Sequence, residues 1–143
     1  MSRLGRSYPY VIEQELLWRD MDAYQHVNNA VYFRYFEDVR MAFFEEVGVV
    51  RLKNETQVGP ILASTRCDYR APLTFPDRIE IGTCIEDIRP KRFTMHYAVF
   101  STGMEAIAAE GAGTLVFYDY DAGRSCEIPD VVRDKLESMQ RKS

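Results

Sequence analysis

The segment from Trp18 to Asn29 gathers the residue types that could perform chemistry. It reads Trp-Arg-Asp-Met-Asp-Ala-Tyr-Gln-His-Val-Asn-Asn, so two carboxylates, one histidine and two amides precede an apolar stretch. If that stretch is a helix, its first turn has unpaired N–H groups and a partial positive charge, which can polarise a carbonyl and hold an oxyanion. A nearby carboxylate could attack that carbonyl or activate a water against it. The segment favours acyl transfer or hydrolysis, although Asp and Asn also serve as turn and cap residues.

The same carboxylates can be compared with two other kinds of site. Asp20 and Asp22 have the spacing of the paired aspartates of phosphate-transferring hydrolases. That pattern needs a buried apolar strand running directly into it, whereas Arg19 precedes Asp20, Tyr24 stands where a threonine is usual, and the chain has no room for the expected doubly wound sheet. Asp20, Asp22 and His26 could ligate a metal, yet the chain has only two histidines, His26 and His96. His96 lies within an expected strand and is interpreted as structural, so we expect no metal site.

A second candidate site is the basic turn Arg89-Pro-Lys91-Arg92. Three cations within four residues could bind the phosphates of a ligand. The alternative is a solvated hairpin tip, because charged residues are usual on protein surfaces. The residue types alone favour that alternative.

The elements that must position these residues follow from the spacing of apolar side chains. Residues 10–19 predict a strand and residues 20–27 a polar loop. A helix of about 19 residues should then begin with Asn28 or Asn29 as its N-cap and end before Gly48. One face of this helix carries apolar residues at spacings of three and four, namely Tyr32, Phe36, Val39, Phe43 and Val47.

The rest of the chain is predicted as strands and a short closing helix. Strands are expected at residues 61–69, 78–87, 92–100 and 106–118. Within the last of these, Gly111 and Gly113 indicate either a bulge or close packing. The C-terminal helix should start near Pro129. The order β-α-β-β-β-β-α indicates an α+β fold with a largely antiparallel sheet.

Length and composition limit the class of protein. The chain has 143 residues, with 18 Lys and Arg against 22 Asp and Glu and a net charge of −4, and we expect one domain over residues 1–143. The acidic balance argues against a nucleic-acid partner. The longest stretch without Asp, Glu, Lys or Arg is 93–104, shorter than the roughly 20 residues of a membrane span. Three cysteines without a C-x-x-C pair are typical of a reduced, cytoplasmic chain.

Two segments of the chain resemble a known family. The stretch from Asp22 to Tyr32, Asp-Ala-Tyr-Gln-His-Val-Asn-Asn-Ala-Val-Tyr, is followed by Tyr35, Glu37 and Arg40 on the expected helix. This pattern is similar to that of the hotdog-fold acyl-CoA thioesterases of the 4-hydroxybenzoyl-CoA thioesterase type. Residues 68–77 resemble the connection between the second and third strands in that family. The resemblance spans about residues 10–120 and implies a long central helix wrapped by a five-stranded antiparallel sheet.

The resemblance also implies roles for particular residues. Asp22 would be the catalytic nucleophile or general base, and His26, Asn28 and Asn29 would orient the thioester or stabilise its oxyanion. The basic turn Arg89, Lys91 and Arg92 would contact the phosphates of coenzyme A. The substrate would be an acyl-CoA or acyl-carrier-protein thioester, with coenzyme A present only as part of the substrate and no other cofactor. Gln25, where the aromatic-specific members have glycine, favours an aliphatic acyl group.

The family likeness implies a homodimer or homotetramer whose site lies between protomers. Exposed edge strands of an open sheet invite such pairing. Two alternative functions share the fold. One is a non-catalytic acyl-CoA binding module, and the other is an enoyl-CoA hydratase or dehydratase that would use His26 with an aspartate to move protons.

Overall fold

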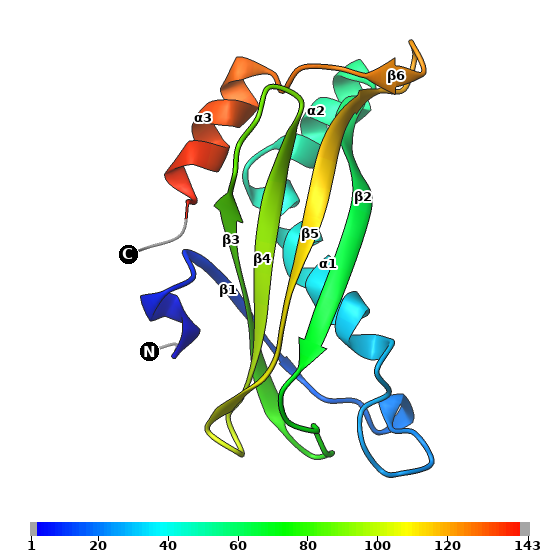
Figure 1. Cartoon of the computed structure of the whole chain (residues 1–143), viewed down its shortest axis with the longest axis vertical. Helices are drawn as coiled ribbons and strands as arrows, with labels where there is room; N and C mark the ends of the chain where they lie inside the picture. The colour runs from blue at the N-terminus through cyan, green and yellow to red at the C-terminus, as the bar shows by residue number, and fades with distance from the viewer. Residues whose placement is uncertain (1–2, 141–143) are drawn as a thin grey trace.

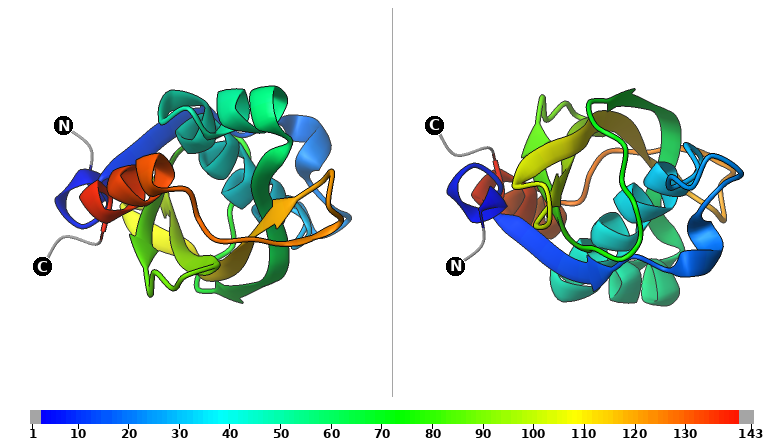
Figure 2. Two further views of the ribbon diagram at one scale, coloured as in Figure 1. Left: turned by 90° about the horizontal axis from the view of Figure 1, so that it is seen from above. Right: turned by 90° about the horizontal axis from the view of Figure 1, so that it is seen from below.

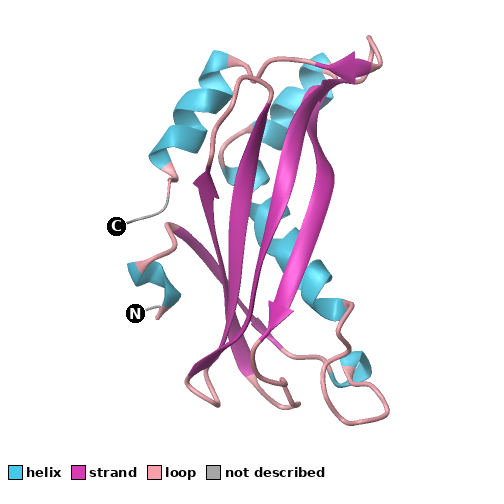
Figure 3. Ribbon diagram, viewed as in Figure 1, coloured by secondary structure: helices cyan, strands magenta, loops and turns pink. Residues whose placement is uncertain are grey.

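A long helix lies against the concave face of a curled antiparallel sheet in the computed structural model of the chain, which describes residues 3–140 (Figure 1). Figure 3 shows how strands make up the middle of the molecule, with helices at its sides. In chain order the elements are η1 (Leu4–Arg6), β1 (Tyr10–Glu15), η2 (Trp18–Asp20), α1 (Val31–Glu46), α2 (Val49–Thr56), β2 (Val58–Tyr69), β3 (Arg78–Glu86), β4 (Arg92–Ser101), β5 (Ala106–Asp119), β6 (Arg124–Ser125) and α3 (Asp130–Ser138).

The sheet has the order β1-β3-β4-β5-β2, and all of these neighbours are antiparallel. The α+β hotdog arrangement implied by the resemblance is confirmed, with a sixth strand, β6, that pairs only two residues with β5. The first strand ends earlier than predicted, at Glu15. One further bond, from the Leu16 N–H to the Asp77 carbonyl at 2.9 Å, continues the pairing with the other strand, β3, and the short 3-10 helix η2 then takes the place of the predicted end of the strand.

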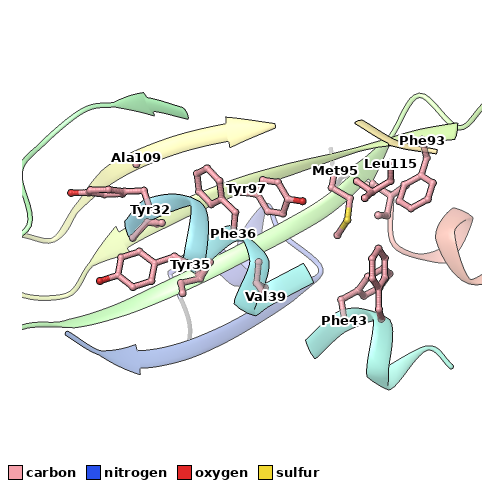
Figure 4. Close-up of a cluster of buried hydrophobic side chains, with 14 of the residues drawn as sticks. Tyr32, Tyr35, Phe36, Val39, Phe43, Phe93, Met95, Tyr97, Ala109 and Leu115 are labelled. Carbon is pink, nitrogen blue, oxygen red and sulfur yellow. The ribbon is translucent and has the colours of Figure 1, made fainter. Parts of the chain in front are cut away.

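The helix α1 supplies one side of the core. Its residues Tyr32, Phe36, Val39 and Phe43 are each at most 2% exposed, which confirms four of the five residues of the predicted apolar face. The fifth, Val47, follows the last residue of the helix and is half-buried. Figure 4 shows these side chains pointing toward residues of β4 and β5, and the rings of Phe36 and Tyr97 stack at 4.7 Å. Because each buried side chain of this size contributes about 1.5–3 kcal/mol, this face fixes the helix against the sheet. Seen from either end, the strands curve around the helix (Figure 2).

The start of α1 differs from the prediction, whereas its end agrees with it. The N-cap is Ala30, not Asn28 or Asn29, and no side chain caps the helix. The reason is an Asx turn, in which Asn28 Oδ1 accepts the Ala30 N–H at 2.9 Å before the helix begins. Gly48 follows the helix with φ of 84°, as expected of a glycine at that position. The chain then forms α2, a helix that the pattern of apolar residues did not predict.

Two segments near the chain ends, η1 and α3, pack against parts of the sheet that α1 does not cover. The turn η1 packs over the outer face, where Leu4 and Tyr8 join Cys84, Ala98 and Phe100 in a second apolar cluster. The helix α3 packs beside β3, and the Met139 carbonyl accepts the Ile85 N–H at 2.9 Å (Figure 1). No helix within residues 3–140 has the length and hydropathy to cross a membrane.

Candidate active site

The loop between η2 and α1 carries Asp22 and is closed on itself by backbone hydrogen bonds. The Asp22 N–H donates to the His26 carbonyl at 2.8 Å, and the Gln25 N–H donates to the Asp22 carbonyl at 3.0 Å. Gln25 takes a φ of 61° to make this tight turn. The Val27 N–H then binds the Leu73 carbonyl at 2.9 Å, so the loop is attached to the connection between β2 and β3.

The carboxylate of Asp22 is held by one of its two oxygens. Oδ1 accepts the Tyr24 N–H at 2.8 Å and a longer bond from the His26 N–H at 3.4 Å. No hydrogen bond from any described residue reaches Oδ2. The side chain is half-buried. The loop therefore orients the carboxylate and leaves one oxygen for a ligand.

A hollow of about 350 Å³ opens beside this carboxylate, at the start of α1. Its lining comes from the Asp22 loop, the first turn of α1 and the connection after β2: Asp22, Tyr24, His26, Val27, Asn29, Tyr32, Tyr69, Arg70, Ala71 and Pro72. Three of the four residues predicted to act on the thioester, Asp22, His26 and Asn29, thus meet in one hollow. The fourth, Asn28, is not part of the lining and uses its side-chain oxygen for the Ala30 N–H.

Two tyrosines form a wall of this hollow. Tyr32 and Tyr69 meet edge to face with ring centroids 5.1 Å apart, and the Tyr69 hydroxyl donates to the Asn29 carbonyl at 2.8 Å. Burial raises the pKa of Tyr32 above its ordinary value, and a backbone hydrogen bond from Leu73 opposes that rise. Tyr69 thereby fastens the end of β2 to the residues that precede α1.

Tyr69, Arg70 and Pro72 had no role in the site predicted from the sequence. The signal that could have found them is present, because residues 68–77 resemble the family's connection between two strands. Tyr32 belongs to the segment from Asp22 to Tyr32 that resembles the family, but the apolar spacing predicts for it only a place in the core.

Asp20 has a structural role, because both of its carboxylate oxygens are bound by Arg34. It is 8% exposed, and its oxygens accept Arg34 Nη1 at 3.1 Å and Nη2 at 2.5 Å. These hydrogen bonds hold the pKa of Asp20 below its ordinary value, although burial acts in the opposite direction. The pair joins the Asp22 loop to α1.

The basic turn lies at the other end of the molecule from the Asp22 loop. It connects β3 and β4 at the top of Figure 1, whereas the loop between η2 and α1 is at the bottom. The ten residues of β4 place the two ends about 30 Å apart. Arg89 donates to Asp87 Oδ1 at 2.7 Å, while Lys91 and Arg92 are exposed. Within one chain, the turn therefore does not meet Asp22.

The remaining groups that could carry chemistry are clusters of metal-ligating side chains and the cysteine thiols. Across residues 3–140, no three His, Cys, Asp or Glu side chains gather in a way that could hold a metal ion. None of the three cysteines forms a disulfide within residues 3–140; Cys84 is buried, and burial raises the pKa of both Cys67 and Cys126. A raised thiol pKa disfavours the nucleophilic thiolate.

Comparison with known proteins gives consistent matches over most of the chain. The family described as the thioesterase-like superfamily matches residues 16–136. A protein of Aquifex aeolicus (strain VF5) named "Putative esterase" is 30% identical over 130 residues, covering 90% of this chain and 98% of that protein. The long-chain acyl-CoA thioesterase FadM of Escherichia coli (strain K12) is 23% identical, covering 83% of this chain and 90% of FadM.

One of the similar solved structures contains a ligand. It is a thioesterase from Thermus thermophilus complexed with coenzyme A and zinc, 25% identical in sequence, with a TM-score of 0.81. The alignment covers 93% of this chain and 95% of that one. The arrangement of strands and helices is therefore shared over nearly the whole length.

Proposed function

The chain belongs to the thioesterase-like superfamily, and from that premise we propose that it hydrolyses an acyl-CoA or acyl-carrier-protein thioester to a free acid and a thiol. The observation that carries the proposal is the state of Asp22. One oxygen of its carboxylate is bound by the loop backbone, and the other faces no partner among the described residues. The acyl-CoA activity of the relative FadM and the coenzyme A bound by the Thermus protein support the same chemistry.

The reaction needs a nucleophile, a carbonyl-polarising group and a proton for the leaving thiolate. Asp22 attacks the thioester carbon itself or removes a proton from a water that attacks it. The new C–O bond forms, the C–S bond breaks, and the thiolate takes up a proton. In the direct route, a water then hydrolyses the resulting anhydride and restores the carboxylate.

The hydrogen-bond donors to the carbonyl oxygen must be N–H groups that do not already bind another acceptor. In the first turn of α1, the N–H groups of Ala30, Val31 and Phe33 already bind acceptors on Asn28 and Ala30. We assign the oxyanion to the N–H groups of Asn29 and Tyr32, because both residues line the hollow and stand at the positive end of the helix. His26, in the same lining, orients the acyl carbonyl.

A second copy of the chain takes part in the proposed active assembly. Within residues 3–140, the strand β2 pairs with β5 on one side only, and residues 62–66 are exposed, so its other edge is open to another strand. The basic turn of Arg89, Lys91 and Arg92 lies at the other end of its own chain from Asp22, with the length of β4, about 30 Å, between the two ends, so in the proposed assembly it contacts the coenzyme A phosphates at the Asp22 site of another copy. Gln25 and the likeness to FadM favour an aliphatic acyl group within the 4-hydroxybenzoyl-CoA thioesterase type.

The decisive experiment is Asp22→Asn, assayed by thiol release from acyl-CoA substrates of graded chain length. The asparagine oxygen can still accept the Tyr24 N–H, so the fold is kept, while kcat falls by about 10²–10⁴-fold. The matched control is Asp121→Asn, the same change at an exposed turn near β6, which should leave the rate unchanged.

Three outcomes would contradict the proposal. An unaltered rate in Asp22→Asn would remove Asp22 from the mechanism. Tight acyl-CoA binding without thiol release by the natural protein would indicate a binding module. Loss of the enoyl-CoA absorbance band without thiol release would indicate a hydratase that uses His26.

A further inference from the structure

An apolar groove between α1, α2 and β2 has no part in the proposed reaction. It encloses about 250 Å³, and α2 lies beside β2 along it (Figure 1). Most of its walls are hydrocarbon side chains, among them Met41, Phe44, Val50, Pro60, Leu62 and Leu115. The groove and the hollow beside Asp22 have no lining residue in common. Arg40, which lines the groove, stands about 14 Å along the helix axis from the first residue of α1.

Two charged residues line this apolar groove, and both are cations, Arg40 and Lys53. Arg40 is buried, with only 9% of its side chain in solvent. Its Nη1 donates to the Tyr97 hydroxyl at 3.1 Å. Its Nη2 lies 3.9 Å from Glu37 Oε2, which is beyond hydrogen-bond distance. Among the described residues, the guanidinium thus has one hydrogen bond for its five N–H donors.

A buried cation in apolar surroundings costs free energy unless an anion compensates it. The Tyr97 hydroxyl is neutral, and 62% of the Glu37 side chain is in solvent, so neither group neutralises Arg40 closely. A carboxylate can accept two parallel N–H bonds from a guanidinium, and the groove walls require the rest of such a ligand to be hydrocarbon. We propose that this groove binds an aliphatic carboxylic acid, with the carboxylate on Arg40 and the chain between α2 and β2.

The rest of the groove fits this class of ligand. Lys53 adds a second positive charge, and its Nζ lies 4.9 Å from the centroid of the Tyr120 ring. The volume is below the roughly 300–1,000 Å³ of sites for drug-sized ligands, which favours a short chain such as that of octanoate. The inference goes beyond the proposed function, because binding of the acid needs no reaction at Asp22. An acid of this class is also what the proposed hydrolysis would release.

Calorimetry of the natural protein with three small molecules tests the ligand chemistry. Octanoate should bind saturably. Octan-1-ol, which has the chain without the charge, and acetate, which has the charge without the chain, should each bind at least about tenfold more weakly. Equal binding of octanoate and octan-1-ol would show that no cation recognises the acid and would overturn the inference.

Two methionines report where the acid binds. Met41 lines the groove, whereas Met21 lies with Asp22 in the wall of a different hollow. With ¹³C-labelled methionine methyl groups, octanoate should shift the Met41 signal and leave the Met21 signal in place. A shift of Met21 alone would place the acid beside Asp22 and overturn the inference.

Variants test the two cations. Arg40→Gln should weaken octanoate binding by about 10- to 100-fold, since a hydrogen bond to a charged group is lost. Lys53→Gln should weaken it by about threefold. Arg51→Gln is the matched control, because Arg51 is on the same helix with 84% of its side chain in solvent, and it should leave the affinity unchanged. If Arg40→Gln does not fold, the comparison of Lys53→Gln with Arg51→Gln decides, and equal affinities in these two variants would overturn the inference.

The inference and the proposed function can fail separately. Thiol release by a protein whose Met41 signal ignores octanoate would overturn the inference and leave the proposed function standing. If the Met41 signal instead changes on dilution and ignores octanoate, a second copy fills the groove, which also overturns the inference. Octanoate binding at Met41 without any thiol release would support the groove assignment and contradict the proposed function.

Discussion

Arg34 and Asp20 form a bidentate ion pair that joins the helix α1 to the loop carrying Asp22. Nη1 and Nη2 of Arg34 donate to the two carboxylate oxygens of Asp20 at 3.1 and 2.5 Å. The Asp20 carbonyl also accepts the Asn28 N–H at 3.0 Å. The position of Asp22 relative to the start of α1 is therefore set from two sides, by a side-chain pair and by a backbone bond.

Asp20→Asn should destabilise the fold at neutral pH by about 1–2 kcal/mol. A hydrogen-bonded charge of this kind contributes about 1.5–3 kcal/mol, and the value is reduced here because 42% of the Arg34 side chain is in solvent. The folded pKa of Asp20 is lowered, so this stability is present above its unfolded pKa of about 3.9 and is lost as pH falls through the lower folded value. Denaturant unfolding at pH 7 and near pH 2 measures both effects.

The control for this experiment is Asp68→Asn. Asp68 pairs with Arg66 at 2.7 Å, but both side chains are about half exposed or more, so the change should cost no more than about 0.5 kcal/mol. Equal losses in the two variants, or a loss in Asp20→Asn that persists unchanged at acid pH, would contradict the role assigned to the Arg34 pair.

Tyr35→Phe should leave the free energy of unfolding unchanged or raise it slightly. The Tyr35 hydroxyl is the one buried side-chain polar atom among the described residues that has no hydrogen-bond partner, and burial raises its pKa. Its removal takes away a desolvation cost and no bond. Tyr97→Phe is the contrast, because the Tyr97 hydroxyl binds Arg40 Nη1 at 3.1 Å and its loss should cost about 1–3 kcal/mol. Thermal unfolding of both variants measures this difference. A larger loss of stability in Tyr35→Phe than in Tyr97→Phe would contradict the prediction.

Tyr69→Phe should reduce turnover more than stability. The ring contact with Tyr32 remains, but the 2.8 Å bond to the Asn29 carbonyl is lost. Stability should fall by no more than about 1 kcal/mol, because Tyr69 is 44% exposed. A looser Asn29 should lower kcat/KM by up to about a hundredfold. Steady-state thiol release tests this against Tyr120→Phe, and equal rates in the two variants would show that the bond does not position the site.

Gly111→Ala should destabilise the sheet by about 1–3 kcal/mol or more. A Cβ at this position would lie 2.5 Å from both the Arg66 carbonyl oxygen and Phe36 Cε2. Gly113→Ala should cost less, since its nearest neighbour is the Leu62 Cδ1 at 3.1 Å, the end of a side chain that is 38% exposed. Chemical denaturation compares the two, and a larger loss at Gly113 would contradict the close approach of Phe36.

The spacing of apolar residues predicted the main elements of the fold. The pattern from Tyr32 to Phe43 located α1 and its buried face, and the four later strands were placed within about three residues of their ends. The glycines in β5 indicated either a bulge or close packing, and the structure shows close packing of Gly111 against Phe36. The short helix α2 was missed, because eight residues with few apolar positions carry too weak a periodic signal.

The sequence by itself determined that Asp22, His26 and Asn29 lie in one segment before a helix, because residues close in the chain stay close in space. Only the tertiary structure decided what faces them. Tyr69 reaches Asn29 across 40 residues of chain, and Phe75 joins Trp18 beside Asp22, because the connection after β2 returns past the start of α1. Within one copy, the length of β4 keeps the basic turn away from the site. These relationships depend on strand length and packing, which no local pattern of residues contains.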